Sequence, residues 1–357
     1  MKTETVLTRQ KIIRLLSLTD SEEQQTLFKR AYAIKVDLLG KKVNLRGLIE
    51  ISNQCRKNCL YCGIRNGNAN VLRFAMKEDE VLEVVTFARS KGLTGVVIQA
   101  GERNDADFVH RITALITKIK AITEADFRIT LSLGEQSAET YQRWFDSGAQ
   151  RYLLRIETSD ETLYRSIHPN DDLHSFETRL KCLESIQQAG FQTGTGVMIG
   201  LPGQTIENLA DDLLFIQQNG IDMVGMGPYL EHGQTPMFER KEKLMPPLER
   251  FGLSLRMIAV LRLLMPTINI ASTTALQSIM STGREAGLRA GANVLMPNLT
   301  PVKYRKSYIL YENKPCLEQE AEETLDNLLL RIGWMGEQVV YSDYGDSRHY
   351  VNRQINH

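Results

Sequence analysis

The chain contains 357 residues, and 43 lysines and arginines balance 43 aspartates and glutamates, so the formal net charge is zero. This balance gives no reason to expect nucleic acid or an anionic membrane surface as a partner. No apolar stretch approaches the ~18 residues of a membrane-spanning helix, and residues 1–5 lack the apolar core of a secretory signal. Since so long a chain has only five cysteines, we expect a reducing environment and a cytoplasmic protein.

The first 40 residues are predicted to form a helical extension, because apolar residues such as Ile12, Ile13 and Leu16 recur at helical spacing. Beyond them, short apolar runs alternate with longer amphipathic stretches. The expected strands cover residues 43–51, 95–100, 127–133, 152–156, 194–199, 223–229, 268–271 and 293–296. The expected helices cover residues 78–91, 107–122, 138–147, 175–189, 206–219 and 247–264, and several of them end at a glycine.

Strands that alternate with helices indicate a parallel sheet with crossover helices. Eight such units predict the α/β class and a full (β/α)8 TIM barrel with an N-terminal helical extension. We expect three parts, namely the extension at residues 1–40, the barrel at 41–312, and a C-terminal helix and tail at 313–357 that pack on the barrel. In such a barrel the functional site lies at the carboxyl ends of the strands.

Three cysteines, Cys55, Cys59 and Cys62, lie in one loop after the first expected strand, with gaps of three and two residues. A cubane iron–sulfur cluster usually takes four cysteines, so three would leave one iron free to bind a small molecule. The spacing alone leaves two other interpretations open, a zinc ion with a borrowed fourth ligand and a purely structural role. The loop therefore predicts a metal centre, and the cluster interpretation gives it an open coordination position.

Polar residues also occupy the ends of later strands. Thr130 and Ser132 are two residues apart on the third expected strand, so they share one face. Arg155 and Glu157 share a face of the fourth strand in the same way. If that face points into the barrel, a charge pair there is costly unless the two charges are paired or bind a ligand. These positions are therefore candidate ligand contacts.

The cysteine loop resembles the CxxxCxxC signature of radical S-adenosylmethionine (SAM) enzymes, including an aromatic residue, Tyr61, directly before the third cysteine. The resemblance implies that the open iron of a [4Fe–4S] cluster chelates the amino and carboxylate groups of SAM. One electron from the reduced cluster would then break the sulfonium C–S bond and give methionine and a 5′-deoxyadenosyl radical. Chemistry of this kind belongs to the cofactor, while the protein positions it and excludes water.

The same resemblance implies roles for residues at the strand ends. Gly101 and Glu102 would offer backbone acceptors to the SAM ammonium group. Arg155 would meet the SAM carboxylate, with Arg179 as a second candidate, because a guanidinium suits two-point contact with a carboxylate. Glu157 would take ribose hydroxyls. The other expected cofactor contacts are Tyr61, Thr130, Ser132, Met223 and Leu230, the last two beside the adenine.

Longer segments resemble the HydE family of FeFe-hydrogenase maturases, which are relatives of biotin synthase and methylornithine synthase. The matching segments are residues 53–63, 131–135, 151–158, 198–205, 222–228, 273–275 and 291–298. The resemblance implies radical attack on a substrate sulfur of an iron–carbonyl–cyanide–cysteine complex during assembly of the hydrogenase di-iron subcluster. It also implies an electron donor such as ferredoxin or flavodoxin, and other hydrogenase maturases as partners. The substrate-side residues carried over are Thr273, Thr274, Met296, Tyr308 and Tyr311.

One departure concerns a second cluster, which some members of the family bind through three more cysteines near the C-terminus. Cys316 stands alone in that region, so we predict one [4Fe–4S] cluster and no second one. We expect Cys182 to be a buried apolar residue and His232 to lie at the surface. The alternatives are a methylornithine-synthase-like mutase or other radical SAM enzyme with a small amino-acid-derived substrate, and a non-catalytic iron–sulfur scaffold that does not cleave SAM.

Overall fold

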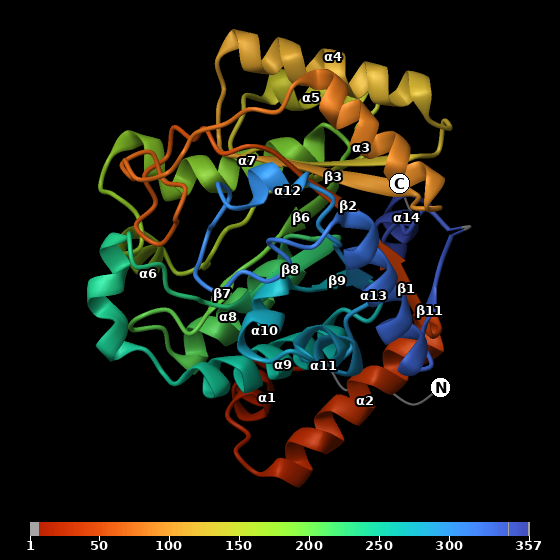
Figure 1. The fold of residues 1–357 in the computed structure, drawn as a ribbon. Helices are drawn as coiled ribbons and strands as arrows, with labels where there is room; N and C mark the ends of the chain where they lie inside the picture. The colour runs from red at the N-terminus through yellow and green to blue at the C-terminus, as the bar shows by residue number, and fades with distance from the viewer. Residues whose placement is uncertain (1–6, 342, 356–357) are drawn as a thin grey trace.

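The protein has an α/β fold in which a parallel sheet curls round and helices lie outside it (Figure 1). The computed structural model describes residues 7–341 and 343–355, so the expectation for residues 1–5 lies outside the described part. The strand order is β11-β1-β10-β9-β8-β6-β5-β4-β3-β2, with β7 beside β8. The strands are β1 Lys42–Leu45, β2 Gly47–Ser52, β3 Gly95–Ala100, β4 Arg128–Ser132, β5 Arg151–Leu153, β6 Gln192–Thr195, β7 Met198–Ile199, β8 Met223–Pro228, β9 Asn269–Ser272, β10 Val294–Leu295 and β11 Gln338–Val339.

Helices separate most of the strands along the chain, as the sequence predicts. They are α1 Arg9–Leu16, α2 Ser21–Leu39, α3 Glu78–Ser90, α4 Ala106–Ile122, α5 Ala138–Asp146, α6 Glu161–Ser166, α7 Phe176–Gln188, α8 Ile206–Gln218, α9 Pro247–Leu264, α10 Thr274–Ile279, α11 Gly283–Arg289, α12 Val302–Arg305, α13 Ala321–Trp334 and α14 Arg348–Ile355. The N-terminal helices lie outside the sheet, where α2 packs on α9 and α1 packs on α8 and α9. In the part of the chain that the structure describes, no helix combines the length and the apolar character that a membrane-spanning helix needs.

The ends of the expected helices are confirmed to within about two residues, and local chemistry explains them. The side chains of Asp105, Ser137 and Thr205 each accept a backbone N–H from the first turn of the helix that follows. Gly148 and Gly190 follow the ends of α5 and α7 with φ of 111° and 95°. A residue with a side chain rarely adopts such left-handed backbone angles, so glycine ends these helices at little cost.

The expected strand at residues 194–199 is divided into β6 and β7. Between them, Gly196 lies so close to β8 that a Cβ there would overlap the carbonyl oxygen of Gly225. After this close approach, Val197 forms a bridge with Glu157, and β7 pairs with the end of β8. Glycine thus permits a backbone contact that interrupts the regular strand.

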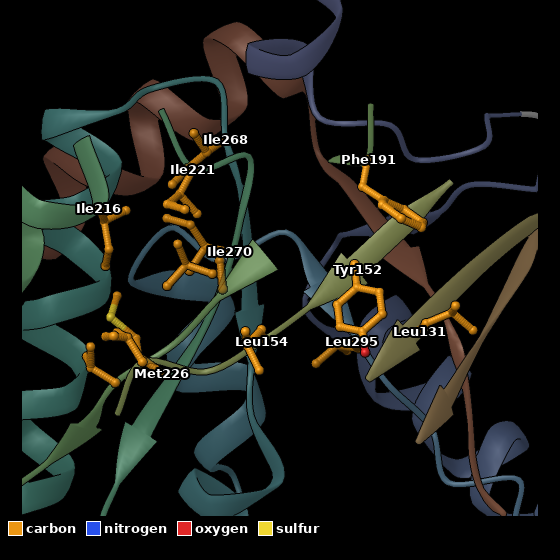
Figure 2. Packing of buried hydrophobic residues seen from close by; sticks show 14 of the residues in the cluster. Leu131, Tyr152, Leu154, Phe191, Ile216, Ile221, Met226, Ile268, Ile270 and Leu295 are labelled. Atoms are coloured by element: carbon orange, nitrogen blue, oxygen red, sulfur yellow. The ribbon is translucent and has the colours of Figure 1, made fainter. Parts of the chain in front are cut away.

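Alternation along the strands places one set of side chains against the surrounding helices (Figure 2). Ile129 and Leu131 of β4 are fully buried in this core, as are Tyr152 of β5 and Ile270 of β9. Burying one such side chain contributes roughly 1.5–3 kcal/mol. Thr130 lies between Ile129 and Leu131, so its side chain belongs to the opposite, inner face of the sheet.

The C-terminal segment crosses the amino ends of several strands. Asp346 accepts hydrogen bonds from Arg128, Arg151 and Gln192 at 2.8, 2.6 and 2.7 Å. These donors are the first residues of β4, β5 and β6. The segment therefore lies at the opposite end of the sheet from the loop that contains the three clustered cysteines.

Candidate metal centre

The cysteine loop follows β2 at the carboxyl end of the parallel strands, and Cys55, Cys59 and Cys62 are free thiols in it. The backbone N–H of Glu102, which follows β3, donates to Cys55 Sγ at 3.3 Å. The backbone N–H of Arg56 donates to the Glu102 carbonyl at 2.8 Å. The loop and the end of β3 are thus joined by two hydrogen bonds, one of them to a candidate ligand sulfur.

The segment between α6 and α7 holds the other side of the loop. The backbone N–H of Asn58 donates to His174 Nε2 at 2.9 Å, and that of Leu60 donates to the Ile167 carbonyl at 3.1 Å. His174 Nδ1 lies 2.5 Å from a carboxylate oxygen of Asp171. Since His174 accepts at Nε2, its proton is on Nδ1, which faces that carboxylate. The residues between Cys55 and Cys62 therefore have a fixed backbone.

Glycines allow the loop to pack closely against its surroundings. A Cβ at Gly101 would lie 2.5 Å from the Gln54 carbonyl oxygen and 2.8 Å from Cys55 Cβ. A Cβ at Gly63 would meet the imidazole ring of His232 at 2.5 Å. His232 is only 8% exposed, so the expectation that it lies at the surface is wrong. Its burial comes from this loop contact, which the local sequence does not reveal.

The three thiols lie in surroundings that disfavour their charged form. Burial raises the pKa of Cys59 to about 12 and also raises the pKa values of Cys55 and Cys62. Metal ligation needs thiolates, so loading this site would release protons. Within the described residues, no group of three or more His, Cys, Asp or Glu side chains is arranged to hold a metal ion. In number and chemical type, though not in the side-chain positions of this structure, three thiols in one loop with a backbone N–H directed at one sulfur fit the ligand set of a cluster with an open iron.

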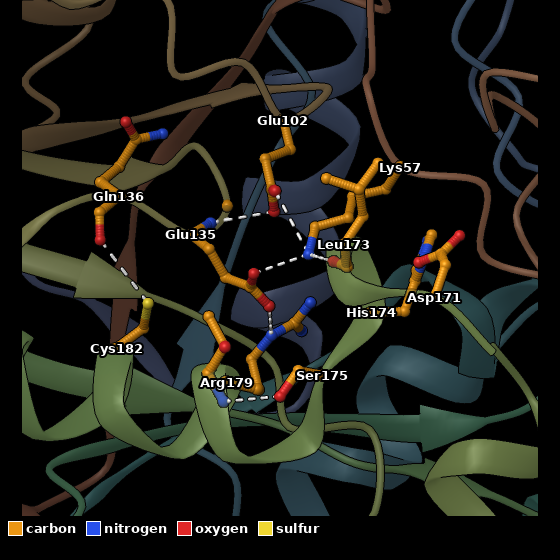
Figure 3. Close-up of polar contacts among 12 residues, drawn as sticks. Lys57, Glu102, Glu135, Gln136, Asp171, Leu173, His174, Ser175, Arg179 and Cys182 are labelled. Atoms are coloured by element: carbon orange, nitrogen blue, oxygen red, sulfur yellow. Dashed lines mark hydrogen bonds and ion pairs between the residues drawn. The ribbon is translucent and has the colours of Figure 1, made fainter. Parts of the chain in front are cut away.

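A buried group of four charged side chains joins the cysteine loop to its surroundings (Figure 3). Its members are Lys57 of the loop, Glu102, Glu135 and Arg179. Lys57 Nζ is 2.6 Å from a Glu135 oxygen and 3.4 Å from a Glu102 oxygen, and it also donates to the Leu173 carbonyl. Arg179 Nε donates to the other Glu135 oxygen at 2.6 Å. Burial raises the pKa of Glu102, while the pKa of Glu135 is lowered because Arg179 and Lys57 outweigh its burial. Lys57 and Glu135 are not among the site residues expected from the sequence.

Arg155 and Glu157 pair with each other after β5. Arg155 Nε is 3.0 Å from both Glu157 oxygens, and Nη2 donates to the Val197 carbonyl at 3.0 Å. Nη1 donates to the Gly225 carbonyl. Glu157 has a φ of 66°, an uncommon value for a residue with a side chain. The Arg155 side chain is 31% exposed, so a ligand can still reach it.

The other expected cofactor contacts are spread round the same end of the sheet. Tyr61 packs edge-on against His168 at 5.5 Å between ring centroids, and burial raises the pKa of Tyr61 well above its usual value. Thr130 Oγ1 is buried and, within the described residues, has no hydrogen-bond partner. Ser132 and Leu230 are half-buried, at the end of β4 and past the end of β8.

Met223 lies at the far end of its strand. It is the first residue of β8, pairs with Asn269, and its Sδ accepts a hydrogen bond from Arg46 at 3.0 Å. Leu230 lies beyond the other end of the same strand. A strand rises about 3.3 Å per residue, so these two side chains cannot contact the same adenine ring. The positions of Met223 and Leu230 therefore do not support the expectation that both lie beside one adenine ring, because strand periodicity gives the face of a residue but not its height along the strand.

The expected substrate-side residues follow the carboxyl ends of β9 and β10. Thr273 occupies the N-cap position of α10, but its hydroxyl donates to the Met226 carbonyl at 3.3 Å and does not cap the helix. The hydroxyl of Thr274 accepts a hydrogen bond from the buried Arg284 at 3.0 Å. Met296 follows β10 and is half-buried. Burial raises the pKa of Tyr308 well above its usual value and that of Tyr311 to about 12.

Two cysteines lie outside the loop. Cys182 is 7% exposed in α7, which confirms that it is a buried core residue. Cys316 is half-buried in the segment before α13.

Comparisons with known proteins show what this chain resembles in sequence and in fold. A model of the radical SAM superfamily matches residues 49–216. The [FeFe] hydrogenase maturase subunit HydE of Thermotoga maritima is 41% identical over 331 residues, which cover 93% of this chain and 91% of that protein. The 3-methylornithine synthase of Methanosarcina acetivorans is 26% identical over 90% of this chain and 87% of that protein. The solved structure of methylornithine synthase (PylB) has the same fold, with a TM-score of 0.81 at 23% identity over 98% of this chain and 97% of that one.

Proposed function

Because this chain belongs to the HydE family of radical SAM enzymes, we propose that Cys55, Cys59 and Cys62 bind one [4Fe–4S] cluster whose open iron binds SAM. The enzyme is a HydE-like maturase of FeFe-hydrogenase. The observation that carries this conclusion is the 41% identity over nearly the full length of both proteins. The cysteine loop agrees with it, since it offers three thiols at the end of the sheet where barrel enzymes have their sites, and residues 52–63 contain no fourth cysteine.

The chain's own residues would bind and orient SAM. When bound and reduced, the cluster supplies the electron that cleaves the sulfonium C–S bond. The carbonyl groups of Gly101 and Glu102 would accept from the SAM ammonium group. Arg155 or Arg179 would hold its carboxylate, and Glu157 its ribose hydroxyls. The supporting observation is that the Arg155 and Glu157 side chains pair at the carboxyl end of the sheet and that Arg155 stays partly exposed.

Further contacts would come from residues round the same end of the sheet. Thr130 has a buried hydroxyl without a partner in the described residues, so it can hydrogen-bond a ligand. Tyr61, Ser132 and Leu230 complete the cofactor side. On the substrate side we propose Thr273, Thr274, Met296, Tyr308 and Tyr311, which follow β9 and β10.

We also propose that the sheet closes into a full eight-stranded barrel. β1 and β2 are separated only by Arg46, and they pair with β10 and β3 respectively. The backbone N–H of Arg46 donates to Leu295 at 3.0 Å, and Leu48 exchanges hydrogen bonds of 2.8 Å with Pro297 and Leu299. Residues 42–52 would thus act as one strand with neighbours on both sides, in a barrel that spans residues 41–312 between the helical extension at 1–40 and the C-terminal part at 313–357.

The proposed substrate is the iron–carbonyl–cyanide–cysteine complex of di-iron subcluster assembly, received from another hydrogenase maturase. A reduced ferredoxin or flavodoxin would supply the electron. We propose a single cluster, since Cys316 has no neighbouring cysteine in its segment of the sequence.

Anaerobic reconstitution followed by dithionite and SAM tests the enzymatic part of the proposal. We expect chromatography to show 5′-deoxyadenosine with the native chain and none with Cys59→Ser. Cys316→Ser is the matched control, and it should retain both the iron content and the product. Cleavage by the Cys59→Ser protein would contradict the assigned ligand set, and a native protein that binds iron but never cleaves SAM would be a scaffold.

The hydrogenase part needs a separate assay. Added with the other maturases to inactive FeFe-hydrogenase, the native chain should restore hydrogen evolution, and Cys59→Ser should not. A chain that cleaves SAM but fails to restore hydrogenase activity would favour the mutase alternative, to which the 26% identity with 3-methylornithine synthase points.

A further inference from the structure

Lys57 is a buried cation within the cysteine loop, between the first two candidate ligands. Its side chain is 4% exposed. The ammonium group contacts Glu135 at 2.6 Å, Glu102 at 3.4 Å and the Leu173 carbonyl. A lysine in a loop is usually solvated, so the free-energy cost of burying its ammonium group must be offset by hydrogen-bond acceptors or opposite charges. Here three acceptors from three different segments offset it.

The four charges of the buried group that contains Lys57 balance one another. Glu102 and Glu135 carry two negative charges, and Lys57 and Arg179 carry two positive ones, with side chains no more than 10% exposed. Removing one member of a buried ion pair leaves an uncompensated buried charge, which is strongly destabilising. The loop and the ends of β3 and β4 are therefore coupled through charge as well as through the backbone.

One short path joins this group to a candidate ligand sulfur. Glu102 holds Lys57 with its carboxylate, and its backbone N–H donates to Cys55 Sγ at 3.3 Å. The Glu102 carboxylate also accepts from the backbone N–H of Glu135 at 2.9 Å, which fixes its direction (Figure 3). Hydrogen bonds to ligand sulfurs and nearby net charge both tune the reduction potential of iron–sulfur clusters.

We propose that Lys57 is a positioning residue that holds Glu102 and Glu135 against the cysteine loop. By balancing their negative charge and by fixing the Glu102 N–H on Cys55 Sγ, it raises the reduction potential of the bound cluster. This inference rests on the proposed function, because it requires the three thiols to hold a cluster. A more positive potential makes the cluster easier to reduce by the electron donor.

The test is an EPR-monitored potential titration of the anaerobically reconstituted protein at one pH. Lys57→Met keeps the length of the side chain and leaves the buried group with one excess negative charge. In this variant the equilibrium constant for reduction of the cluster should fall about tenfold, which lowers the reduction potential by 59 mV for a one-electron couple. Lys57→Arg restores the charge and should stay within threefold of the native value. Lys77→Met, which removes an exposed lysine further along the chain, is the control and should not shift the potential.

A double variant separates charge from loss of packing. In Lys57→Met with Glu135→Gln, one negative charge is removed along with the positive one, and glutamine can still accept from Arg179. The double variant should recover most of the lost potential. If Lys57→Met loads too little iron to titrate, recovery of iron in the double variant supports the inference, and failure to recover it overturns it.

Two outcomes keep this inference distinct from the proposed function. A native protein without a cluster or without SAM cleavage would refute the proposed function itself. A native protein with both, whose Lys57→Met variant has full iron content and an unchanged potential, would leave the function intact and overturn the role of Lys57.

Discussion

At the scale of single residues, Arg155 already donates hydrogen bonds from all three of its guanidinium nitrogens. Its guanidinium contacts Glu157 and the carbonyl groups of Val197 and Gly225. Arg179, in turn, donates to the Arg155 carbonyl at 2.5 Å. The two candidate carboxylate-binding arginines are therefore linked, and each is already fixed in direction. Such fixed donors bind a charged ligand at a small entropic cost.

Arg155→Ala should weaken SAM binding more than it slows cleavage. Loss of a charge-assisted contact costs about 1.5–3 kcal/mol, so the KM for SAM should rise roughly 10–100-fold. Steady-state formation of 5′-deoxyadenosine at varied SAM concentration measures this change. Arg165→Ala, which removes an exposed pair with Glu161, is the control and should leave KM unchanged. An unaltered KM in Arg155→Ala would exclude this contact.

Gly101→Ala should lower the iron content of the reconstituted protein. The new Cβ would lie 2.5 Å from the Gln54 carbonyl oxygen and 2.8 Å from Cys55 Cβ, so the loop must shift. Gly333→Ala in α13 is the matched control, because no atom lies within 4 Å of its Cβ. Iron analysis after identical reconstitution compares the two, and equal iron contents would show that the loop tolerates the shift.

His168 should make the fold sensitive to acid. Burial lowers its pKa to about 3 from its ordinary value of 6.5, so the folded state disfavours the protonated ring. The stability from this group is present above pH 6.5 and is lost as the pH falls toward 3, by about 2 kcal/mol between pH 8 and pH 5. Urea unfolding at both pH values should show a smaller loss for His168→Gln than for the native chain. Equal losses would contradict this assignment.

At the scale of elements, the two ends of the sheet carry different groups. The cysteine loop lies at the carboxyl ends of the strands, whereas the C-terminal segment lies at their amino ends through Asp346. Although burial acts to raise it, the pKa of Asp346 is lowered by Arg151 and Arg128. Arg151 is 1% exposed, so its charge depends on this carboxylate.

Asp346→Ala should therefore destabilise the fold by about 3 kcal/mol, since it leaves buried Arg151 without its partner. Asp211→Ala removes an exposed pair with Arg9 and should change the free energy of unfolding far less. Denaturant unfolding of both variants gives the comparison. Similar values for the two would mean that the C-terminal segment adds little to the fold.

The main helices and strands could be predicted from periodicity because they are long or strongly alternating. The short helices α10 and α11 were not predicted, since six and seven residues give too little periodicity. The height of a residue along its strand could not be predicted either. For this reason Met223 and Leu230 were expected beside one adenine ring, although they lie at opposite ends of β8. Lys57 and His232 were missed for a related reason, because contacts with segments far away in the sequence bury them.

At the scale of the whole molecule, the sheet with its outer helices provides a rigid framework, and the cysteine loop provides the candidate metal ligands. The curled parallel sheet brings the ends of β2, β3, β4 and β5 to one side, and the cysteine loop lies there. The helices outside the sheet bury the core that keeps these ends in place. The cysteine spacing could be read from the sequence, whereas the charges and hydrogen bonds around it required the fold.

EPR of the dithionite-reduced, anaerobically reconstituted protein with and without SAM tests whether the three cysteines hold a cluster with an open iron, with iron and sulfide measured on the same sample. We expect one [4Fe–4S] cluster per chain, hence about four irons and four sulfides, and a spectrum that changes when SAM binds the open iron. Zinc in place of iron, or a cluster whose spectrum SAM leaves unchanged, would contradict this expectation.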